Sequence, residues 1–258
     1  MCRMLAYLGN NILLSKLLLI PEHSLEKQAW QPKELRETKL NADGFGFAWY
    51  PDNSSETYRY RNTLPIWNDS NLPALSNSMQ RPLWMAIVRS ATEGLSVTLD
   101  NTPPFTHLQW CFMHNGYLLN FETDSREKIR NEISAEYLAL IKGSTDSEYI
   151  FALLVQLLET NTPVIAIQEC MRIITEIMGS NRALLNIILS DGEQLYATRH
   201  AINGISPSLY YTNNTAEFGP DNQLIASEKL NDDSNWITIA EHEMIIVQNN
   251  HAIKKIKL

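Results

Sequence analysis

The sequence TDSEYIFALLVQLL, residues 145–158, marks the point where the chain changes from strand-like to helical periodicity. Thr145 and Glu148 have the Thr-x-x-Glu spacing of a capping box, and apolar residues follow at helical intervals. A second amphipathic pattern, at residues 164–178, ends near Gly179. These two segments predict a pair of consecutive helices in the middle of the chain.

The chain on either side of these helices favours strands. Before them, apolar or alternating runs occupy residues 3–9, 44–50, 57–61, 83–88 and 108–113, with a short helix expected near residues 13–18. After them, strands are predicted at residues 184–189, 194–198, 224–226, 236–239, 244–247 and 252–256. Strands, then two helices, then strands again are typical of a layered α+β fold and not of alternating βαβ units.

The composition fits one globular domain spanning residues 1–258. Hydrophobic residues make up 44% of the chain and charged residues 19%, which is enough for a full core and gives no sign of disorder. No stretch between the periodic segments has the composition of a linker, and this length is ordinary for one layered domain. We therefore expect a single domain.

Charge and cysteine content argue against several classes of partner. The net charge of −8 is the opposite of what binds nucleic acid or an anionic membrane. No apolar run reaches the ~18 residues of a membrane span, and the N-terminus lacks the pattern of a signal peptide. The cysteines are scattered, with no Cys-x-x-Cys pair and no clustered histidines. We expect a soluble cytoplasmic protein with no metal, no cofactor, and neither nucleic acid nor membrane as a partner.

Cys2 is the most informative residue for chemistry. Removal of Met1 would place a thiol and a free α-amine on the same residue. Because an α-amine has a reference pKa of ~7.7–8.0, it can accept the thiol proton without a histidine partner. Taken alone, a cysteine here is more simply the second residue of a strand.

His114, Asn115 and Gly116 follow the predicted strand at residues 110–113. A side-chain amide and a backbone N–H that leave a sheet edge together can form an oxyanion hole, with donors about 2.7–3.1 Å from the oxyanion. The alternative is an ordinary turn, since Asn-Gly is the commonest dipeptide of hairpin turns.

Arg89 and Asp146 are candidate ligand-binding charges. Arg89 follows the apolar strand at residues 83–88, where its guanidinium suits a carboxylate, although an internal ion pair explains it almost as well. Asp146 either caps the helix that starts there or holds a ligand ammonium. With a thiol and an oxyanion hole, these two charges would describe recognition and hydrolysis of a γ-glutamyl amide.

Five motifs together resemble the class II glutamine amidotransferases, which are N-terminal-nucleophile hydrolases. In chain order they are Met1-Cys2-Arg3 and residues 41–46 (NADGFG), 88–92 (VRSAT), 112–116 (FMHNG) and 145–148 (TDSE). Residues 225–230 (IASEKL), followed by Trp236, resemble the last strands of stand-alone members, so the resemblance covers nearly the whole chain. It implies an α+β fold, a four-layer αββα sandwich of two antiparallel sheets flanked by helices.

The resemblance also implies a role for each site residue. Cys2 would be the nucleophile, and Asn115 (side chain) and Gly116 (backbone N–H) would form the oxyanion hole. Arg89 would bind the substrate α-carboxylate and Asp146 its α-amine. The remaining expected substrate-binding residues are Ser90, Thr92 and His114. Water would then open a thioester intermediate and release glutamate.

Within the family, the chain most resembles the branch that hydrolyses γ-glutamyl-hercynylcysteine sulfoxide in ergothioneine biosynthesis. It shares the NADG turn and the RSATxG stretch at residues 89–94, and we expect no synthase domain in it. Where many members have Asn-x-His-Pro, this chain has Pro103 in place of the histidine, which that branch lacks too. We expect an enzyme that hydrolyses a small γ-glutamyl substrate.

Two other functions stay open. One is a glutaminase subunit that supplies ammonia to a separate synthase, and the other is a non-catalytic protein that binds γ-glutamyl compounds. The sequence does not identify the leaving group. It also leaves open whether the protein forms a homo-oligomer, a complex with a synthase, or neither.

Overall fold

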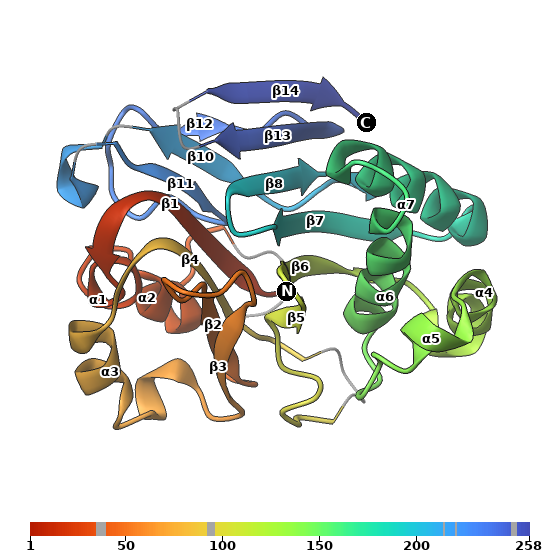
Figure 1. The fold of residues 1–258 in the computed structure, drawn as a ribbon, viewed down its shortest axis with the longest axis horizontal. Coiled ribbons are helices and arrows are strands. Elements are labelled where there is room, and N and C mark those ends of the chain that lie inside the picture. Colours follow the sequence, from red (N-terminus) through yellow and green to blue (C-terminus); the bar gives the residue numbers. More distant parts are fainter. Residues whose placement is uncertain (35–39, 92–95, 214, 220, 249–251) are drawn as a thin grey trace.

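The computed structural model describes residues 1–34, 40–91, 96–213, 215–219, 221–248 and 252–258. Two antiparallel sheets lie face to face between two groups of helices, which is the expected four-layer α+β arrangement (Figure 1). The N-terminus lies in the middle of the molecule, beside β5 and β6 (Figure 1). The first residues of the chain are therefore positioned between the sheets.

The first sheet contains seven strands and includes the N-terminal strand at its centre. Its order is β12 (Ile237–Thr238), β10 (Tyr210–Asn213), β11 (Gln223–Ala226), β1 (Arg3–Leu13), β4 (Gln80–Val88), β2 (Phe45–Trp49) and β3 (Tyr58–Asn62). The pairing of β2 with β3 confirms the hairpin predicted at residues 44–61. Near its start, β1 pairs with the end of β4, so that Arg3 lies opposite Val88 and Cys2 lies close to Arg89 in the sheet.

The second sheet is built around the hairpin that follows the two long helices. Its order is β14 (Ile253–Lys257), β13 (Glu243–Gln248), β8 (Gln194–Arg199), β7 (Ala183–Ser190), β6 (Trp110–Leu118) and β5 (Phe105–His107), with β9 (Ala201–Ile202) also paired to β7. The predicted hairpin of β7 and β8 is confirmed.

The helices form the two outer layers. The first sheet is covered by α1 (Ser15–Leu18), α2 (Leu25–Trp30) and α3 (Leu72–Ser78), and the second by α4 (Arg126–Glu132), α5 (Ala135–Leu138), α6 (Asp146–Leu158) and α7 (Pro163–Met178) (Figure 1). Short turns of other helix types occupy Ile66–Asn68, Phe121–Ser125 and Ala216–Phe218. No helix in the described part of the chain is long and apolar enough to cross a membrane.

The two long helices begin and end where the sequence predicts. Thr145 caps α6, accepting a hydrogen bond from the Glu148 N–H while the Glu148 side chain accepts one from the Thr145 N–H. Gly179 follows α7 with φ of +54°, a left-handed conformation that glycine adopts without a steric penalty.

Three apolar clusters separate the four layers. One lies between the second sheet and helices α4–α7, a second packs the first sheet against α1–α3, and a third joins the two sheets. Cys2 packs at the border of the third cluster, which contains Met4 and Met113. The thiol is thus partly buried between the sheets and not exposed at a frayed terminus.

The interpretation of Asn115-Gly116 as a turn is wrong. Strand β6 continues through both residues to Leu118, and Asn115 pairs with Asn186 of β7. The turn propensity of Asn-Gly is overridden here by pairing with a long neighbouring strand, since tertiary context outweighs local preference.

Candidate active site

A small cavity of about 40 Å³ lies where the two sheets meet the first turn of α6. Its lining is made by Cys2, Arg89, Ser90, Asn101, Pro103, Phe105, His114, Gly116, Thr145, Asp146 and Ser147. The structure therefore brings together six predicted site residues: Cys2, Arg89, Ser90, His114, Gly116 and Asp146. Asn115 does not line the cavity, and Thr92 lies outside the described residues.

Cys2 is held at the cavity by its neighbour Arg3. The Arg3 guanidinium donates to the Cys2 carbonyl oxygen at 2.9 Å through Nη1 and to Oε1 of Glu228 at 2.7 Å through Nε. Both Arg3 and Glu228 are almost completely buried. A charged pair in the core thus fixes the backbone of the cysteine.

Glu228 is the centre of this buried cluster. Its carboxylate also accepts hydrogen bonds from His23 Nε2 at 2.7 Å and from the backbone N–H of Lys33 at 2.8 Å. Burial alone would raise the pKa of Glu228, but the His23 hydrogen bond and the charge of Arg3 outweigh it and lower the pKa to about 2. Glu228 is therefore a permanent anion at neutral pH, opposite the Arg3 cation.

Arg89 is a buried guanidinium with unused donors. Its Nη1 donates to the Asp43 carbonyl oxygen at 3.3 Å, and no carboxylate of the described residues lies within 4 Å of it. Burial lowers its pKa, against the opposing charges of Cys2 and Asp43. A cation that is desolvated without a partner suits a negatively charged ligand group in the cavity.

The Asn41–Gly44 turn positions this arginine. The Asp43 carboxylate accepts a hydrogen bond from the Ala91 N–H at 2.8 Å, and the Arg89 N–H donates to the Gly44 carbonyl at 2.8 Å. The turn therefore braces the end of β4 and the start of the segment that follows.

Asp146 is tied to β6 through the backbone. Its Oδ2 accepts a hydrogen bond from the Leu118 N–H at 2.8 Å, and its Oδ1 accepts one from the Ser147 N–H at 2.7 Å. Its carboxylate lies on the cavity wall while serving the first turn of α6. Both interpretations of Asp146, as a helix-terminal carboxylate and as a cavity group, are compatible with this geometry.

His114 joins three elements. Its Nε2 lies 2.8 Å from the Leu184 carbonyl oxygen, which can only accept, so this nitrogen carries the proton. In the neutral ring, Nδ1 then accepts from the Ser147 hydroxyl at 2.9 Å. His114 thereby links β6 to β7 and to the start of α6.

Gly116 allows the close approach of β7. An added Cβ would lie 1.8 Å from the Leu184 carbonyl oxygen, far inside any real contact, so no other residue fits without backbone movement. The Leu119 N–H points towards β7 and donates to the backbone carbonyl oxygen of Arg182, whereas the Leu118 N–H donates to the Asp146 carboxylate. Because N–H groups alternate in direction along a strand, the Gly116 N–H points to the Asp146 side, away from β7.

Asn115 is completely buried, and neither side-chain polar atom has a hydrogen-bond partner. Its side chain lies on the face of β6 opposite to that of His114, since successive side chains alternate. Buried amide groups are normally satisfied, so an unpaired one next to a cavity is a candidate for contact with ligand or water.

Asn101 is a cavity residue to which the sequence assigned no role. Its Nδ2 donates to the Ser96 carbonyl at 2.9 Å, and its Oδ1 accepts from the Ser144 N–H at 2.8 Å, joining the segment before β5 to the segment before α6. Gly143 makes room for it, because an added Cβ there would lie 2.1 Å from Asn101 Oδ1. Such contacts between loops carry no periodic signal in the sequence.

The described residues contain no group of three or more His, Cys, Asp and Glu side chains that could hold a metal ion. Cys111 and Cys170 are both buried as free thiols within the cores, where burial raises the pKa of Cys170 to about 12 and that of Cys111 further. Cys2, the third, is the thiol at the cavity.

Comparisons with known proteins agree with this architecture. The family model of the class II glutamine amidotransferases matches residues 19–223. The chain is 39% identical over 166 residues to the probable glutamine amidotransferase DUG3 of Saccharomyces cerevisiae. That match covers 62% of this chain but 46% of the yeast protein, so this chain spans less than half of that relative.

A second relative matches end to end. The γ-glutamyl-hercynylcysteine sulfoxide hydrolase of Mycolicibacterium smegmatis is 25% identical over 253 residues, which cover 98% of each chain. Cys2 and Glu228 both lie outside residues 19–223, the stretch that the family model matches.

Solved structures share the fold. A class II glutamine aminotransferase domain protein from Silicibacter pomeroyi superposes with a TM-score of 0.75 at 26% identity, covering 100% of this chain and 99% of that one. The phosphoribosylpyrophosphate amidotransferase of B. subtilis has a TM-score of 0.66 at 14% identity and is covered over 49% of its length. The second likeness concerns the fold alone.

Proposed function

Because the chain belongs to the class II glutamine amidotransferases and is an amide-bond hydrolase, we propose that it cleaves the γ-glutamyl amide of a small molecule through a thioester on Cys2. The observation that carries this proposal is the meeting of the Cys2 thiol, the Arg89 guanidinium and the Asp146 carboxylate around one cavity. A γ-glutamyl group presents a carboxylate, an ammonium and a reactive carbonyl, and each of these has a counterpart there.

Recognition rests on two opposite charges. Arg89, which has no carboxylate partner among the described residues, binds the substrate α-carboxylate through its fork of N–H donors. Asp146 binds the α-ammonium, with Ser90 and His114 completing this side of the cavity. Fixing both charges of the glutamyl group leaves its γ-carbonyl as the part that reaches the thiol.

The nucleophile is the Cys2 thiolate. After removal of Met1, the Cys2 α-amine takes the thiol proton and the sulfur attacks the γ-carbonyl carbon. The C–N bond then breaks, and the α-ammonium of Cys2 gives its proton to the leaving amine. Water, deprotonated by the same amine, opens the thioester and yields glutamate and free thiol.

The oxyanion of both tetrahedral intermediates is stabilised by Asn115 and Gly116. The Gly116 N–H points away from β7 on the Asp146 side, and the Asn115 amide is buried without a partner. Removing one donor of this kind costs about 10²–10³-fold in rate in other hydrolases. The unpaired Asn115 amide supports this role. A buried donor without a partner is costly, and the oxyanion would supply the acceptor that it lacks.

The substrate we propose is γ-glutamyl-hercynylcysteine sulfoxide. Supporting it are the end-to-end match to the mycolicibacterial hydrolase and Pro103 in the position where many family members have histidine. The leaving part would be the sulfoxide-bearing amine, and the retained part glutamate.

The test is glutamate release by purified protein whose N-terminus has been checked by intact mass. Offered γ-glutamyl-hercynylcysteine sulfoxide and glutamine separately, protein lacking Met1 should release glutamate from the sulfoxide with the larger kcat/KM. Comparable release from glutamine, or release that requires a co-purifying synthase, would instead favour a subunit that supplies ammonia. Absence of release from any γ-glutamyl amide by protein with a free Cys2 would refute hydrolysis.

A further inference from the structure

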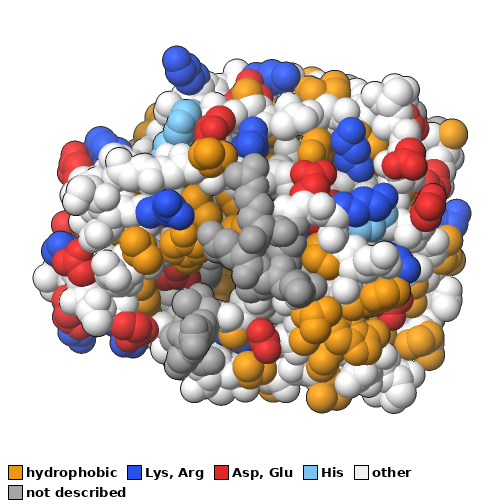
Figure 2. Space-filling model, turned by 180° about the vertical axis from the view of Figure 1, so that it is seen from behind, with side chains coloured by type: hydrophobic (Ala, Val, Ile, Leu, Met, Phe, Trp, Pro, Cys, Tyr) orange, Lys and Arg blue, Asp and Glu red, His pale blue; other side chains and the backbone are white. Residues whose placement is uncertain are grey.

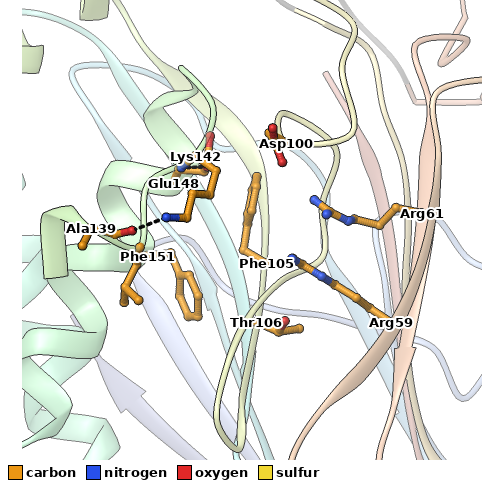
Figure 3. A pocket seen from close by; sticks show the side chains of 10 residues that line it. Arg59, Arg61, Asp100, Phe105, Thr106, Ala139, Lys142, Glu148 and Phe151 are labelled. Atoms are coloured by element: carbon orange, nitrogen blue, oxygen red, sulfur yellow. Dashed lines mark hydrogen bonds between the residues drawn. The ribbon is translucent and has the colours of Figure 1, made fainter.

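A second cavity of about 290 Å³ lies beside the candidate active site and shares Phe105 with it. Figure 3 shows Arg59 and Arg61 reaching into this space from one side, with Phe105 between them and the elements around Glu148 on the other side. We name it the arginine cavity after these two residues. Its volume is close to the lower end of the range for small-molecule sites, about 300 Å³.

The two arginines share one face of β3. Residues two apart on a strand point the same way, so Arg59 and Arg61 face the cavity while Tyr60 packs on the other face against Phe45 and Phe47. Arg59 Nη1 donates to the Pro104 carbonyl at 2.8 Å, and Arg61 Nη1 donates to the Thr102 carbonyl at 3.1 Å. Each guanidinium is thus anchored by one nitrogen to the segment before β5, with its other donors not engaged by described residues.

Neither arginine is neutralised. No carboxylate of the described residues lies within 4 Å of Arg59 or Arg61. Burial, and then the charge of Arg61, lower the pKa of Arg59 to about 10. Two partly buried cations beside one another raise each other's free energy, and a bound anion would relieve this.

Three other charged groups face the cavity. The Glu148 carboxylate is already engaged, accepting from the N–H groups of Lys142 at 3.1 Å and Gly143 at 2.9 Å. The Lys142 ammonium adds a positive charge and donates to the Ala139 carbonyl at 2.7 Å (Figure 3). The Asp100 and Glu148 carboxylates both oppose an incoming anion, and Asp100 has no hydrogen bond from the described residues that would disperse its charge.

Apart from Thr106, the rest of the lining is apolar. Phe105 and Phe151 stand on the side of the cavity away from β3 (Figure 3), and both are buried in the core of the second sheet. A ligand held here would place a charged group on the arginines and an apolar body against the two rings.

We propose that the arginine cavity binds the carboxylate or phosphate group of a small molecule whose apolar part packs against Phe105 and Phe151. That anion has two sources: the leaving part of the γ-glutamyl substrate, or a separate ligand bound next to the active site. The first source rests on the proposed function, whereas anion binding itself does not.

Binding is tested by NMR titration of the full chain with benzoate, benzamide and inorganic phosphate. Benzoate should bind at least about tenfold more tightly than its neutral isostere benzamide, because charge-assisted hydrogen bonds contribute more than neutral ones. Arg59→Gln and Arg61→Gln should each weaken benzoate binding at least about tenfold. Asp100→Asn should tighten it, and Arg130→Gln, which removes an exposed arginine paired with Glu127 on α4, should leave it unchanged.

Enzyme kinetics distinguish the two sources of the anion, the leaving part of the substrate and a separate ligand. If the leaving part carries the anion, Arg59→Gln should lower kcat/KM at least about tenfold for γ-glutamyl-phenylalanine but not for glutamine or γ-glutamyl-phenylalaninamide. If the ligand is separate, the variant should lose benzoate or phosphate binding while kcat/KM changes by one common factor for all three substrates.

Equal affinity for benzoate and benzamide would overturn the proposal, as would benzoate binding that is the same in wild type, Arg59→Gln and Arg61→Gln. Thermal melting shows whether each variant is folded, and Asp100→Asn tests the same cavity without removing an arginine. The titration needs no turnover, so it tests anion binding even if the proposed hydrolysis fails.

Discussion

At the scale of single residues, the proposed function divides the site into a reacting thiol and two recognition charges. Cys2, Arg89 and Asp146 come from three distant parts of the chain and meet at one cavity. Substitution of Cys2 should therefore affect turnover more than affinity, and substitution of Arg89 should affect affinity more than turnover.

Cys2→Ala should abolish turnover, by at least about 10⁴-fold in kcat, because no other thiol lines the cavity among the described residues. Affinity for the γ-glutamyl substrate should stay within about threefold of wild type, since the charges that hold the glutamyl group are intact. Isothermal titration calorimetry measures this directly. A loss of binding equal to the loss of turnover would contradict the division of roles.

Arg89→Lys should have the converse effect. A lysine ammonium cannot reproduce the two parallel N–H donors of a guanidinium, so we expect KM or Kd to rise about tenfold or more with a smaller change in kcat. Arg81→Lys, a substitution near the start of β4, the strand that leads to Arg89, lies away from the cavity and serves as the matched control. Unchanged Kd in Arg89→Lys would remove Arg89 from substrate recognition.

At the scale of elements, the first turn of α6 connects folding to the site. Its capping box holds the turn that presents Asp146 to the cavity and ties Glu148 to the preceding loop. The helix and its start were predicted because capping and apolar periodicity are both local properties of the sequence.

Thr145→Ala should destabilise the protein by about 1 kcal/mol, which is typical of losing an N-cap side chain. The matched control is Thr162→Ala, at the N-cap of α7, where the side chain makes no capping hydrogen bond. We expect the control to lose less than about 0.5 kcal/mol, measured by urea denaturation. Equal losses in both variants would show that the capping box contributes nothing measurable.

Elements with weak local signals were not predicted. Strands β5 and β9 have three and two residues, too few for any alternation to be visible, and their pairing comes from neighbours distant in sequence. The end of β6 was placed too early because Asn115-Gly116 has a strong turn propensity, which pairing with β7 overrides.

The candidate site likewise contains residues that local motifs predict and residues that only tertiary contacts place. The cavity positions of Cys2, Arg89 and Asp146 follow motifs in the sequence, whereas the tie made by Asn101 depends on how two loops approach. Arg59 and Arg61 alternate visibly in the sequence, yet the opposite wall of the cavity comes from the segment after α5 and from α6, and could not be foreseen.

At the scale of the whole molecule, the cluster of Arg3, His23 and Glu228 joins the two ends of the chain. Glu228 lies 225 residues from Arg3 and accepts hydrogen bonds from both Arg3 and His23. The cluster holds the start of β1, and with it Cys2, against the segment that follows β11.

The rear face of the molecule is of mixed character (Figure 2). On the rear face, acidic and basic side chains are interspersed, and hydrophobic side chains gather towards the side that carries α1–α3 in Figure 1 (Figure 2).

The low pKa of Glu228 predicts a loss of stability in acid. Its pKa is about 2 in the folded protein and about 4.5 ordinarily, so the unfolded chain takes up the proton first as pH falls. The stabilisation is complete above about pH 5 and should be lost between about pH 4.5 and pH 2, on the order of 3 kcal/mol. Denaturant unfolding at several pH values measures it.

Glu228→Gln is the variant that isolates this contribution. It leaves Arg3 buried beside a neutral amide, which should cost about 3–5 kcal/mol at pH 7 and flatten the acid dependence between pH 4.5 and pH 2. Glu122→Gln removes an exposed partner of Arg126 and should cost less than about 1 kcal/mol. An acid profile identical to wild type in Glu228→Gln would assign the pH dependence to other groups.

The measurement that tests the central claim most directly is covalent labelling of the cavity thiol. Protein with and without Met1 is treated with a diazoketone analogue of glutamine, and the labelled peptide is identified by mass spectrometry. The account predicts one adduct, on Cys2 of the processed chain, which excess glutamate suppresses and which the chain retaining Met1 does not form. Labelling of Cys111 or Cys170 in place of Cys2, or no labelling of processed protein that releases glutamate, would contradict it.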